Sequence, residues 1–172
     1  MIFVTVGSMF PFDRLIQRMD EWAASNGKTE VFAQTGNGSY APKNMRYARR
    51  VSQAEFAATV ARAEVVVAHA GMGTVITAGL AGRPLVLLPR VEKWGEHTTD
   101  HQIATASWLR EKPGIFVADT DADLPHMIAA ALLAGGSQGA RIPDVAAPAF
   151  TDRLRAAIIG FNAAASEKGP KR

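Results

Sequence analysis

The stretch that decides the fold spans residues 65–89 and reads VVVAHAGMGTVITAGLAGRPLVLLP. Short apolar runs open and close it, at 65–68 and 84–89, and the residues between them match the length of a crossover helix that joins two parallel strands. Gly71 and Gly73 follow the first run, where they let the backbone turn sharply and approach a ligand closely. We therefore predict a strand, a glycine loop, a helix and a second strand, with the first N–H groups of the helix available to an anion.

Strands and helices alternate along almost the whole chain. The predicted strands lie at residues 1–6, 29–34, 45–48, 65–68, 84–89 and 115–118. Asp13 is predicted to cap the first helix, and Ser52 with Glu55 to form a capping box on the helix after the third strand. A last amphipathic helix is predicted at 151–165. This alternation predicts an α/β fold with a doubly wound, mostly parallel, Rossmann-like sheet.

The composition bounds the class of protein. The 172 residues suffice for one domain, which we expect at 1–165, followed by a basic, flexible tail at 166–172. No apolar run approaches the roughly 18 residues of a membrane span, and no basic segment precedes the apolar N-terminus, so neither a spanning helix nor a signal peptide is expected. The absence of cysteine excludes disulfides and thiolate metal sites, and a net charge of +3 with scattered basic residues gives little support for nucleic-acid binding. These properties predict a cytoplasmic protein.

Ligands of doubly wound sheets bind at the carboxyl ends of the strands. In this chain, that rule selects the loops at residues 7–8, 34–38, 49–52, 69–74 and 89–102. The loop at 69–74 is too short for the dinucleotide-binding glycine fingerprint, and the chain has no P-loop motif. Taken alone, it fits a tight turn without a ligand as well as it fits a binding loop. His69 at its start favours the binding loop, although a histidine at a strand end is commonly a buried structural residue.

A second polar cluster follows the apolar run at 84–89. Its members are Arg90, Glu96, His97, Asp100, His101 and Gln102. His97 and His101 have the spacing of two metal ligands on a helix, but the polar loop before residue 99 argues against a helical His97, so no metal is expected. A helix that starts with Asp100, His101 and Gln102 is better suited to hydrogen-bond the hydroxyls of a sugar. A helix that is only capped by Asp100 is the alternative.

A series of segments resembles the C-terminal domain of family 28 glycosyltransferases: MIFVTVGS at 1–8, QTG at 34–36, HAGMGT at 69–74, GRPLVLLPR at 82–90 and GEHTTDHQ at 95–102. The resemblance covers about residues 1–135. It is closest to the small stand-alone members, which include the catalytic subunit of the dolichol-linked UDP-GlcNAc transferase and bacterial exopolysaccharide transferase subunits. The resemblance implies the C-terminal half of a GT-B fold, in which two Rossmann-like domains face each other and this half holds the nucleotide sugar.

The resemblance also implies roles for individual residues. The donor-binding residues would be Gly7 and Ser8 in the first loop, His69, Ala70, Gly71, Met72, Gly73 and Thr74 at the diphosphate and ribose, and Arg90, Glu96, His97, Asp100, His101 and Gln102 at the sugar. Residues 49–52 match the region near the base. Thr77 stands where peptidoglycan GlcNAc transferases carry a ribose-binding glutamate, so ribose recognition must differ. The catalytic base is expected on a partner, and the candidates within this chain are His69, Glu96 and His97.

The function implied by the resemblance is the inverting transfer of a sugar from a UDP-sugar to a polyprenyl-linked acceptor in exopolysaccharide or glycan synthesis, without a metal or another cofactor. Because the chain matches only the donor half, the resemblance implies a membrane-anchored partner subunit that binds the lipid-linked acceptor and brings the chain to the inner membrane. In isolation the chain could self-associate. A non-catalytic nucleotide-sugar-binding or assembly module is the alternative. The sequence does not distinguish N-acetylglucosamine, glucose and glucuronic acid.

Overall fold

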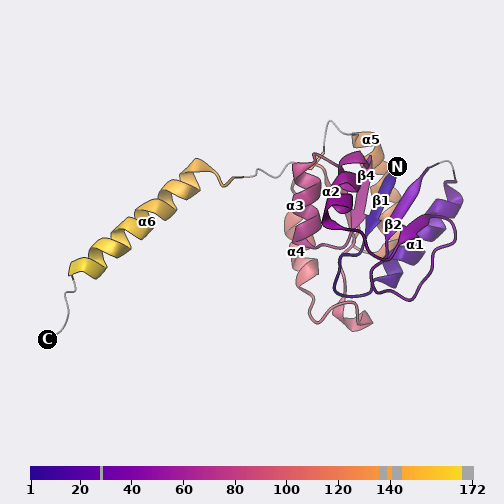
Figure 1. The fold of residues 1–172 in the computed structure, drawn as a ribbon, viewed down its shortest axis with the longest axis horizontal. Helices are drawn as coiled ribbons and strands as arrows, with labels where there is room; N and C mark the ends of the chain where they lie inside the picture. Colours follow the sequence, from indigo (N-terminus) through magenta and orange to yellow (C-terminus); the bar gives the residue numbers. More distant parts are fainter. Residues whose placement is uncertain (28, 136–138, 141–144, 168–172) are drawn as a thin grey trace. The chain divides into compact units, whose positions relative to one another are not determined.

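The computed structural model describes residues 1–27, 29–135, 139–140 and 145–167 (Figure 1). The chain divides into two units, Met1–Ile142 and Pro143–Arg172. The predicted domain boundary at residue 165 stays a prediction, and residues 168–172 of the predicted tail lie outside the described residues.

The first unit is built on a six-stranded parallel sheet. Its strands are β1 (Ile2–Thr5), β2 (Val31–Gln34), β3 (Arg46–Ala48), β4 (Val65–Ala68), β5 (Leu85–Leu87) and β6 (Ile115–Val117). Their order is β3-β2-β1-β4-β5-β6, and every neighbouring pair is parallel. All six predicted strands are therefore present, and the predicted Rossmann-like architecture is confirmed. The order reverses between β1 and β4, which is the point where open α/β sheets form a ligand-binding crevice.

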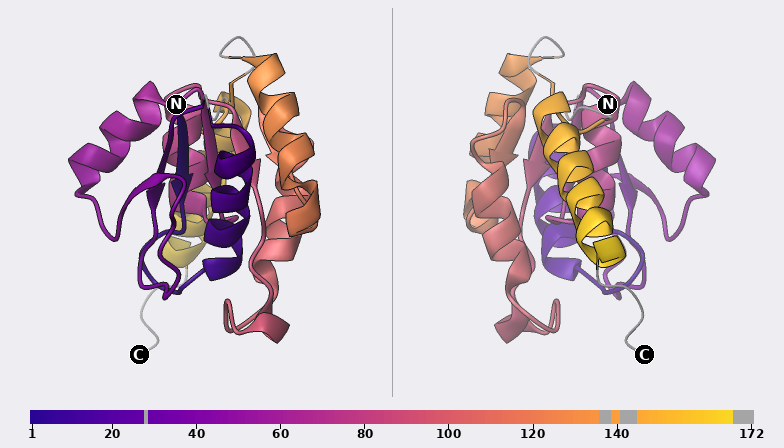
Figure 2. Two further views of the ribbon diagram at one scale, coloured as in Figure 1. Left: turned by 90° about the vertical axis from the view of Figure 1, so that its right-hand side faces the viewer. Right: turned by 90° about the vertical axis from the view of Figure 1, so that its left-hand side faces the viewer.

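Helices cover both faces of this sheet. They are α1 (Asp13–Ser25), α2 (Gln53–Arg62), α3 (Met72–Leu80), α4 (His101–Leu109) and α5 (Leu124–Ala134), with short 3-10 turns η1 (Glu92–Trp94) and η2 (Asp121–Asp123). Side chains of α1 and α5 share one buried cluster with the strands, and side chains of α2, α3 and α4 share the other. Figure 2 shows α2 and α5 on opposite sides of the strands.

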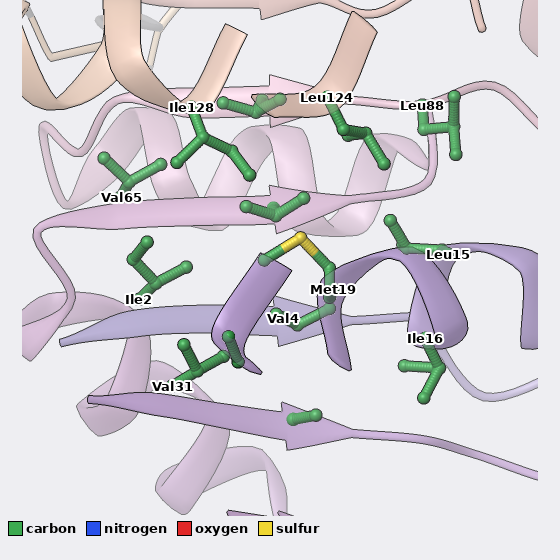
Figure 3. Packing of buried hydrophobic residues seen from close by; sticks show 14 of the residues in the cluster. Ile2, Val4, Leu15, Ile16, Met19, Val31, Val65, Leu88, Leu124 and Ile128 are labelled. Atoms are coloured by element: carbon green, nitrogen blue, oxygen red, sulfur yellow. The ribbon is translucent and has the colours of Figure 1, made fainter. Parts of the chain in front are cut away.

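The burial of the central strand β4 on both faces explains why apolar and polar residues do not alternate in its sequence. All four of its residues are fully buried. Val65 and Val67 belong to the cluster with α1 and α5, whereas Val66 and Ala68 belong to the cluster on the opposite face. Figure 3 shows the first cluster, where Val65 lies among Ile2, Val4, Val31, Leu15, Ile16, Met19, Leu88, Leu124 and Ile128. A strand that is buried on both faces needs an apolar residue at every position.

One of the two predicted helix caps is confirmed. Ser52 Oγ accepts a hydrogen bond from the Glu55 N–H at 3.2 Å, and the Glu55 carboxylate accepts one from the Ser52 N–H at 2.8 Å. The cap predicted from Asp13 is wrong, because this residue begins α1 and follows the N-cap Phe12. Its carboxylate instead accepts hydrogen bonds from Ser39 N–H and Oγ, at 3.0 and 2.6 Å. Asp13 therefore fixes the loop after β2 rather than the start of its own helix.

The second unit contains α6 (Pro148–Glu167), which begins three residues before the predicted helix at 151–165 and ends two residues after it. Phe150, Leu154 and Ile158 recur at intervals of four and so lie along one side of the helix. All three are exposed. Among the described residues, no helix has the length and apolar character needed to cross a membrane.

Asp20 anchors the connection between β2 and β3 to α1. This buried carboxylate accepts hydrogen bonds from the N–H groups of Lys43 and Asn44, at 3.0 and 2.7 Å, and from the Tyr40 hydroxyl at 2.8 Å. Burial alone would raise the pKa of Asp20, but these hydrogen bonds outweigh burial and lower it. The buried Asp20 carboxylate is therefore ionised, and hydrogen bonds from the β2–β3 connection compensate for its burial.

Replacing Asp20 with alanine is expected to lower the free energy of unfolding by about 2–3 kcal/mol, because three donors lose a charged acceptor. Glu21→Ala is the matched control, since the neighbouring carboxylate is exposed and should change stability by no more than about 0.5 kcal/mol. Urea unfolding at neutral pH measures both values. Equal effects of the two substitutions would contradict the anchoring role.

Candidate functional site

A pocket of about 560 Å³ lies at the carboxyl ends of the strands, around the reversal between β1 and β4. The predicted site residues that line it are Gly7, Ser8, His69, Gly71, Gly73, Thr74, Arg90, His97 and Gln102. They come from the loops after β1, β4 and β5 and from the first turns of α3 and α4. The structure thus brings together residues that are up to 95 positions apart in the sequence.

The His69 ring is held between two glycines. A Cβ atom on Gly7 would lie 2.7 Å from His69 Cε1, and a Cβ atom on Gly71 would lie 2.1 Å from His69 Nε2. Gly7 also has a φ angle of 75°, which other residues rarely adopt. Both positions therefore need glycine to leave room for the imidazole ring.

His69 is neutral at physiological pH. Burial, and then the positive charge of Arg90, lower the pKa of the imidazole from 6.5 to about 4. A neutral imidazole carries one N–H donor and one acceptor nitrogen. It can therefore donate a hydrogen bond to an anion without itself carrying a charge.

The start of α3 supplies further donors. Gly71 is its N-cap, and no side chain of the described residues caps this helix. The first N–H groups of a helix have no acceptor in a preceding turn, and the helix dipole places partial positive charge there. In α3 the Thr74 N–H already donates to the Gly71 carbonyl at 3.1 Å, which leaves the N–H groups before it. A Cβ atom on Gly73 would meet nothing within 4 Å, so the pocket is open at this point.

The sequence matches the family model described as "Glycosyltransferase family 28 C-terminal domain" over residues 1–133. The chain belongs to this family. Its fold is accordingly that of the C-terminal half of a GT-B glycosyltransferase. A search of curated proteins found no match.

Three solved structures illustrate the shared fold. The glycosyltransferase of kitacinnamycin has a TM-score of 0.55 and 21% identity, covering 90% of this chain and 37% of that chain. The spinosyn forosaminyltransferase SpnP has a TM-score of 0.51 and 21% identity, covering 76% and 34%. The Methanocaldococcus jannaschii UDP-GlcNAc 2-epimerase, whose structure contains UDP-GlcNAc and UDP, has a TM-score of 0.52 and 11% identity, covering 76% and 38%. The family 28 chain therefore spans little more than a third of these relatives, and identities this low establish the fold alone.

Five of the predicted donor-binding residues do not line the pocket. They are Ala70, Met72, Glu96, Asp100 and His101. Ala70 is buried, whereas Met72 is exposed. Asp100 is the N-cap of α4, but its carboxylate accepts a hydrogen bond from the Glu92 N–H at 2.8 Å instead of capping that helix.

His97 and His101 remain close to the pocket and to each other. Their ring centroids are 4.4 Å apart, and the His97 ring lies 4.9 Å from that of Phe10. His97 lies in the loop before α4, as the sequence suggested, and not on the helix. Burial, and then the charge of His101, lower the pKa of His97. In the described part of the chain, no group of three His, Asp or Glu side chains is placed to hold a metal ion.

Arg90 lines the pocket, but its hydrogen bonds go to the protein. Arg90 is 2% exposed, and its guanidinium donates to the carbonyls of Val6, Phe10 and Glu96, at 2.5, 2.8 and 3.0 Å. Its backbone N–H donates to Gln102 Oε1 at 3.2 Å. Burial lowers the pKa of Arg90 to about 10, against the charge of Glu96, so Arg90 stays ionised at neutral pH.

Several residues that line the pocket have no role predicted from the sequence. These are Thr5, Val6, Met9, Phe10, Gln34, Gln53 and Phe56. Thr5 and Gln34 are buried polar residues at the ends of apolar strands, bonded to each other at 2.7 Å, and the Gln34 amide also donates to Gly7 O at 3.0 Å. The strand-end rule had selected the loop that contains Gln34 without giving this residue a role, and the signal for Thr5 is a polar residue at the carboxyl end of a buried strand.

Thr77 lines the pocket without offering a carboxylate. Its hydroxyl donates to the Gly73 carbonyl at 2.8 Å, within α3. This position therefore offers no carboxylate to a ligand, and its hydroxyl proton is already used within the helix.

His69 is expected to make the protein acid-sensitive. Its folded pKa lies below its unfolded value, so its contribution is present above pH 6.5 and is lost as the unfolded chain takes up a proton between pH 6.5 and 4. The loss between pH 7.5 and 4.5 should reach about 2–3 kcal/mol. His69→Gln should remove this part of the pH dependence, whereas His126→Gln, an exposed histidine on α5, should retain it. Urea unfolding at the two pH values tests this, and equal pH dependence in both variants would contradict it.

Proposed function

We propose that this chain is the donor-binding, catalytic half of a metal-independent inverting glycosyltransferase that uses a UDP-sugar. The observation that carries the proposal is the pocket itself, which joins the uncapped start of α3 to His69, His97 and Arg90. Within the described residues, no Asp or Glu lines it. A pocket with donors, one buried positive charge and no carboxylates favours an anionic ligand.

The diphosphate would lie against the loop at 69–74. The N–H group of Gly73 and the neutral imidazole of His69 offer hydrogen bonds to phosphate oxygens. During transfer the bond between the sugar and the diphosphate breaks, and negative charge develops on the departing UDP. Donors that are fixed in advance stabilise this charge, so the leaving group does not depend on a metal ion.

The sugar would lie beside His97 and Gln102, which follow β5, and the base beside Val51, Gln53 and Phe56. The Arg90 N–H can only donate, so the Gln102 atom that faces it is the amide oxygen. The amide NH₂ of Gln102 is thereby left as a donor for an oxygen of the sugar. Phe56 packs edge-on against Phe3, with centroids 5.6 Å apart, which gives the base end a fixed apolar wall.

The acceptor and the partner are further parts of the proposal. We propose that a membrane-anchored subunit similar to the other half of a GT-B transferase binds a polyprenyl-linked acceptor in exopolysaccharide or glycan synthesis, and brings this chain to the inner membrane. This chain covers only 37% and 34% of two structures with the same fold. The proposed partner would correspond to the part of those chains that this chain does not cover. The base that accepts the proton of the acceptor hydroxyl would be on that subunit. Of the candidates in this chain, His69 and His97 line the pocket and Glu96 does not.

Gly73→Val should weaken donor binding without unfolding the protein. The added side chain has free space around its Cβ and projects where the pocket is open, so it should exclude the diphosphate. We expect UDP affinity to fall at least about tenfold and turnover with the partner by about 10²-fold, the effect of losing one fixed donor. Calorimetry with UDP and with a panel of UDP-sugars measures binding, and transfer in membranes that contain the partner measures turnover.

Gly27→Val is the control, because Gly27 also has free space around its Cβ and lies outside the pocket lining. Unchanged binding in a folded Gly73→Val protein would sink the proposed diphosphate site. Binding of a UDP-sugar without transfer to any lipid-linked acceptor would favour a non-catalytic binding module.

A further inference from the structure

Arg14 is tied to the loop after β5, although it belongs to α1. Its guanidinium donates from Nε to Glu96 Oε1 at 2.7 Å and from Nη2 to Glu96 Oε2 at 2.8 Å. The same Nη2 donates to the Pro89 carbonyl at 3.1 Å, and the guanidinium lies 4.3 Å from the centre of the Trp94 ring. The side chains of Arg14 and Glu96 are only 17% and 9% exposed. A paired, shielded fork of this kind fixes geometry much better than an exposed ion pair does.

Glu96 forms a hydrogen bond within its own loop as well as the ion pair with Arg14 of α1. Its Oε2 also accepts a hydrogen bond from the Val91 N–H at 2.9 Å. One carboxylate therefore closes the segment at 91–96 and fastens it to Arg14. This use of both oxygens explains why Glu96 lies outside the pocket lining.

Arg90 joins the same loop to the opposite wall of the pocket. Its guanidinium bonds the Glu96 carbonyl on one side and the carbonyls of Val6 and Phe10 on the other. Its backbone N–H orients Gln102. The segment at 90–102 is therefore held by Arg14 of α1 and by Arg90, which belongs to the segment itself. This segment carries the proposed sugar end of the pocket.

We propose that Arg14, acting through Glu96, is a positioning residue for the sugar end of the donor pocket. This inference rests on the proposed function. Arg14 does not line the pocket, so it would act by fixing the segment at 90–102, which includes the start of α4 and from which His97 and Gln102 would reach the sugar. The diphosphate end belongs to β1 and β4 and does not depend on this pair. Loss of Arg14 should therefore weaken recognition of the sugar and leave recognition of the nucleotide diphosphate intact.

The test compares Arg14→Met with Arg18→Met. Arg18 lies one turn further along α1 and also forms an ion pair, with Asp121 at 2.6 Å, but this pair is more exposed and does not involve the loop at 90–102. Calorimetry on the full chain measures the affinity for UDP and for the UDP-sugar that the wild-type protein binds most tightly. For Arg14→Met we expect UDP affinity within about threefold of wild type and UDP-sugar affinity reduced at least about tenfold. Both affinities should stay near wild type in Arg18→Met.

Two further measurements separate positioning from general stability. Glu96→Gln should reproduce the selective loss, and the double variant with Arg14→Met should lose no more than either single variant, because both remove one interaction. Amide hydrogen exchange should accelerate at 91–102 in Arg14→Met but not in Arg18→Met. Equal losses for UDP and UDP-sugar, additive effects, or identical behaviour of Arg14→Met and Arg18→Met would overturn the inference. A wild-type protein that binds neither ligand would overturn the proposed function, and the inference with it.

Discussion

The parallel pairing of β1 with β4 is the constraint on which the site depends. Ile2 lies opposite Val65 and Thr5 opposite Ala68, so the two strands end at the same level of the sheet. The loops that follow leave the sheet next to each other and then separate, because α1 packs on one face and α3 on the other. The space between them arises from topology alone, and the pocket opens there.

The side chains then give this space its chemistry. Gly7 and Gly71 come from the two adjoining loops, and both are small because the His69 ring occupies the room that their side chains would need. The close approach buries the imidazole, and burial keeps it neutral. A single packing arrangement thus fixes the position of His69, its protonation state and the open backbone of the loop beside it.

The sequence predicted most of the fold and the location of the site, because both follow from local rules. The unbroken apolar run at 65–68 indicated a strand buried on both faces, and the rule on strand ends selected the loops that line the pocket. It did not predict what Glu96 and Asp13 do. Their partners, Arg14 and Ser39, are 82 and 26 residues away, and spacing along the chain carries no information on such pairings. The local sequence suggested that Glu96 contacts a sugar and that Asp13 caps a helix, whereas both carboxylates hold loops in place.

The same pairings decide the charge that a ligand meets. Arg14 and Arg90 both lie near Glu96, but the carboxylate oxygens of Glu96 bond Arg14, while Arg90 bonds its backbone carbonyl. Arg14 also lies 3.9 Å from the Asp121 carboxylate, whereas no carboxylate of the described residues accepts a hydrogen bond from Arg90. Arg90 lines the pocket, is almost fully buried and donates to carbonyls rather than to a carboxylate, and its Nε has no hydrogen-bond partner within the described residues. A charge in that setting is poorly screened by water, so it favours an anion in the pocket. Arg90 thus joins the two walls of the pocket and also adds positive potential to it.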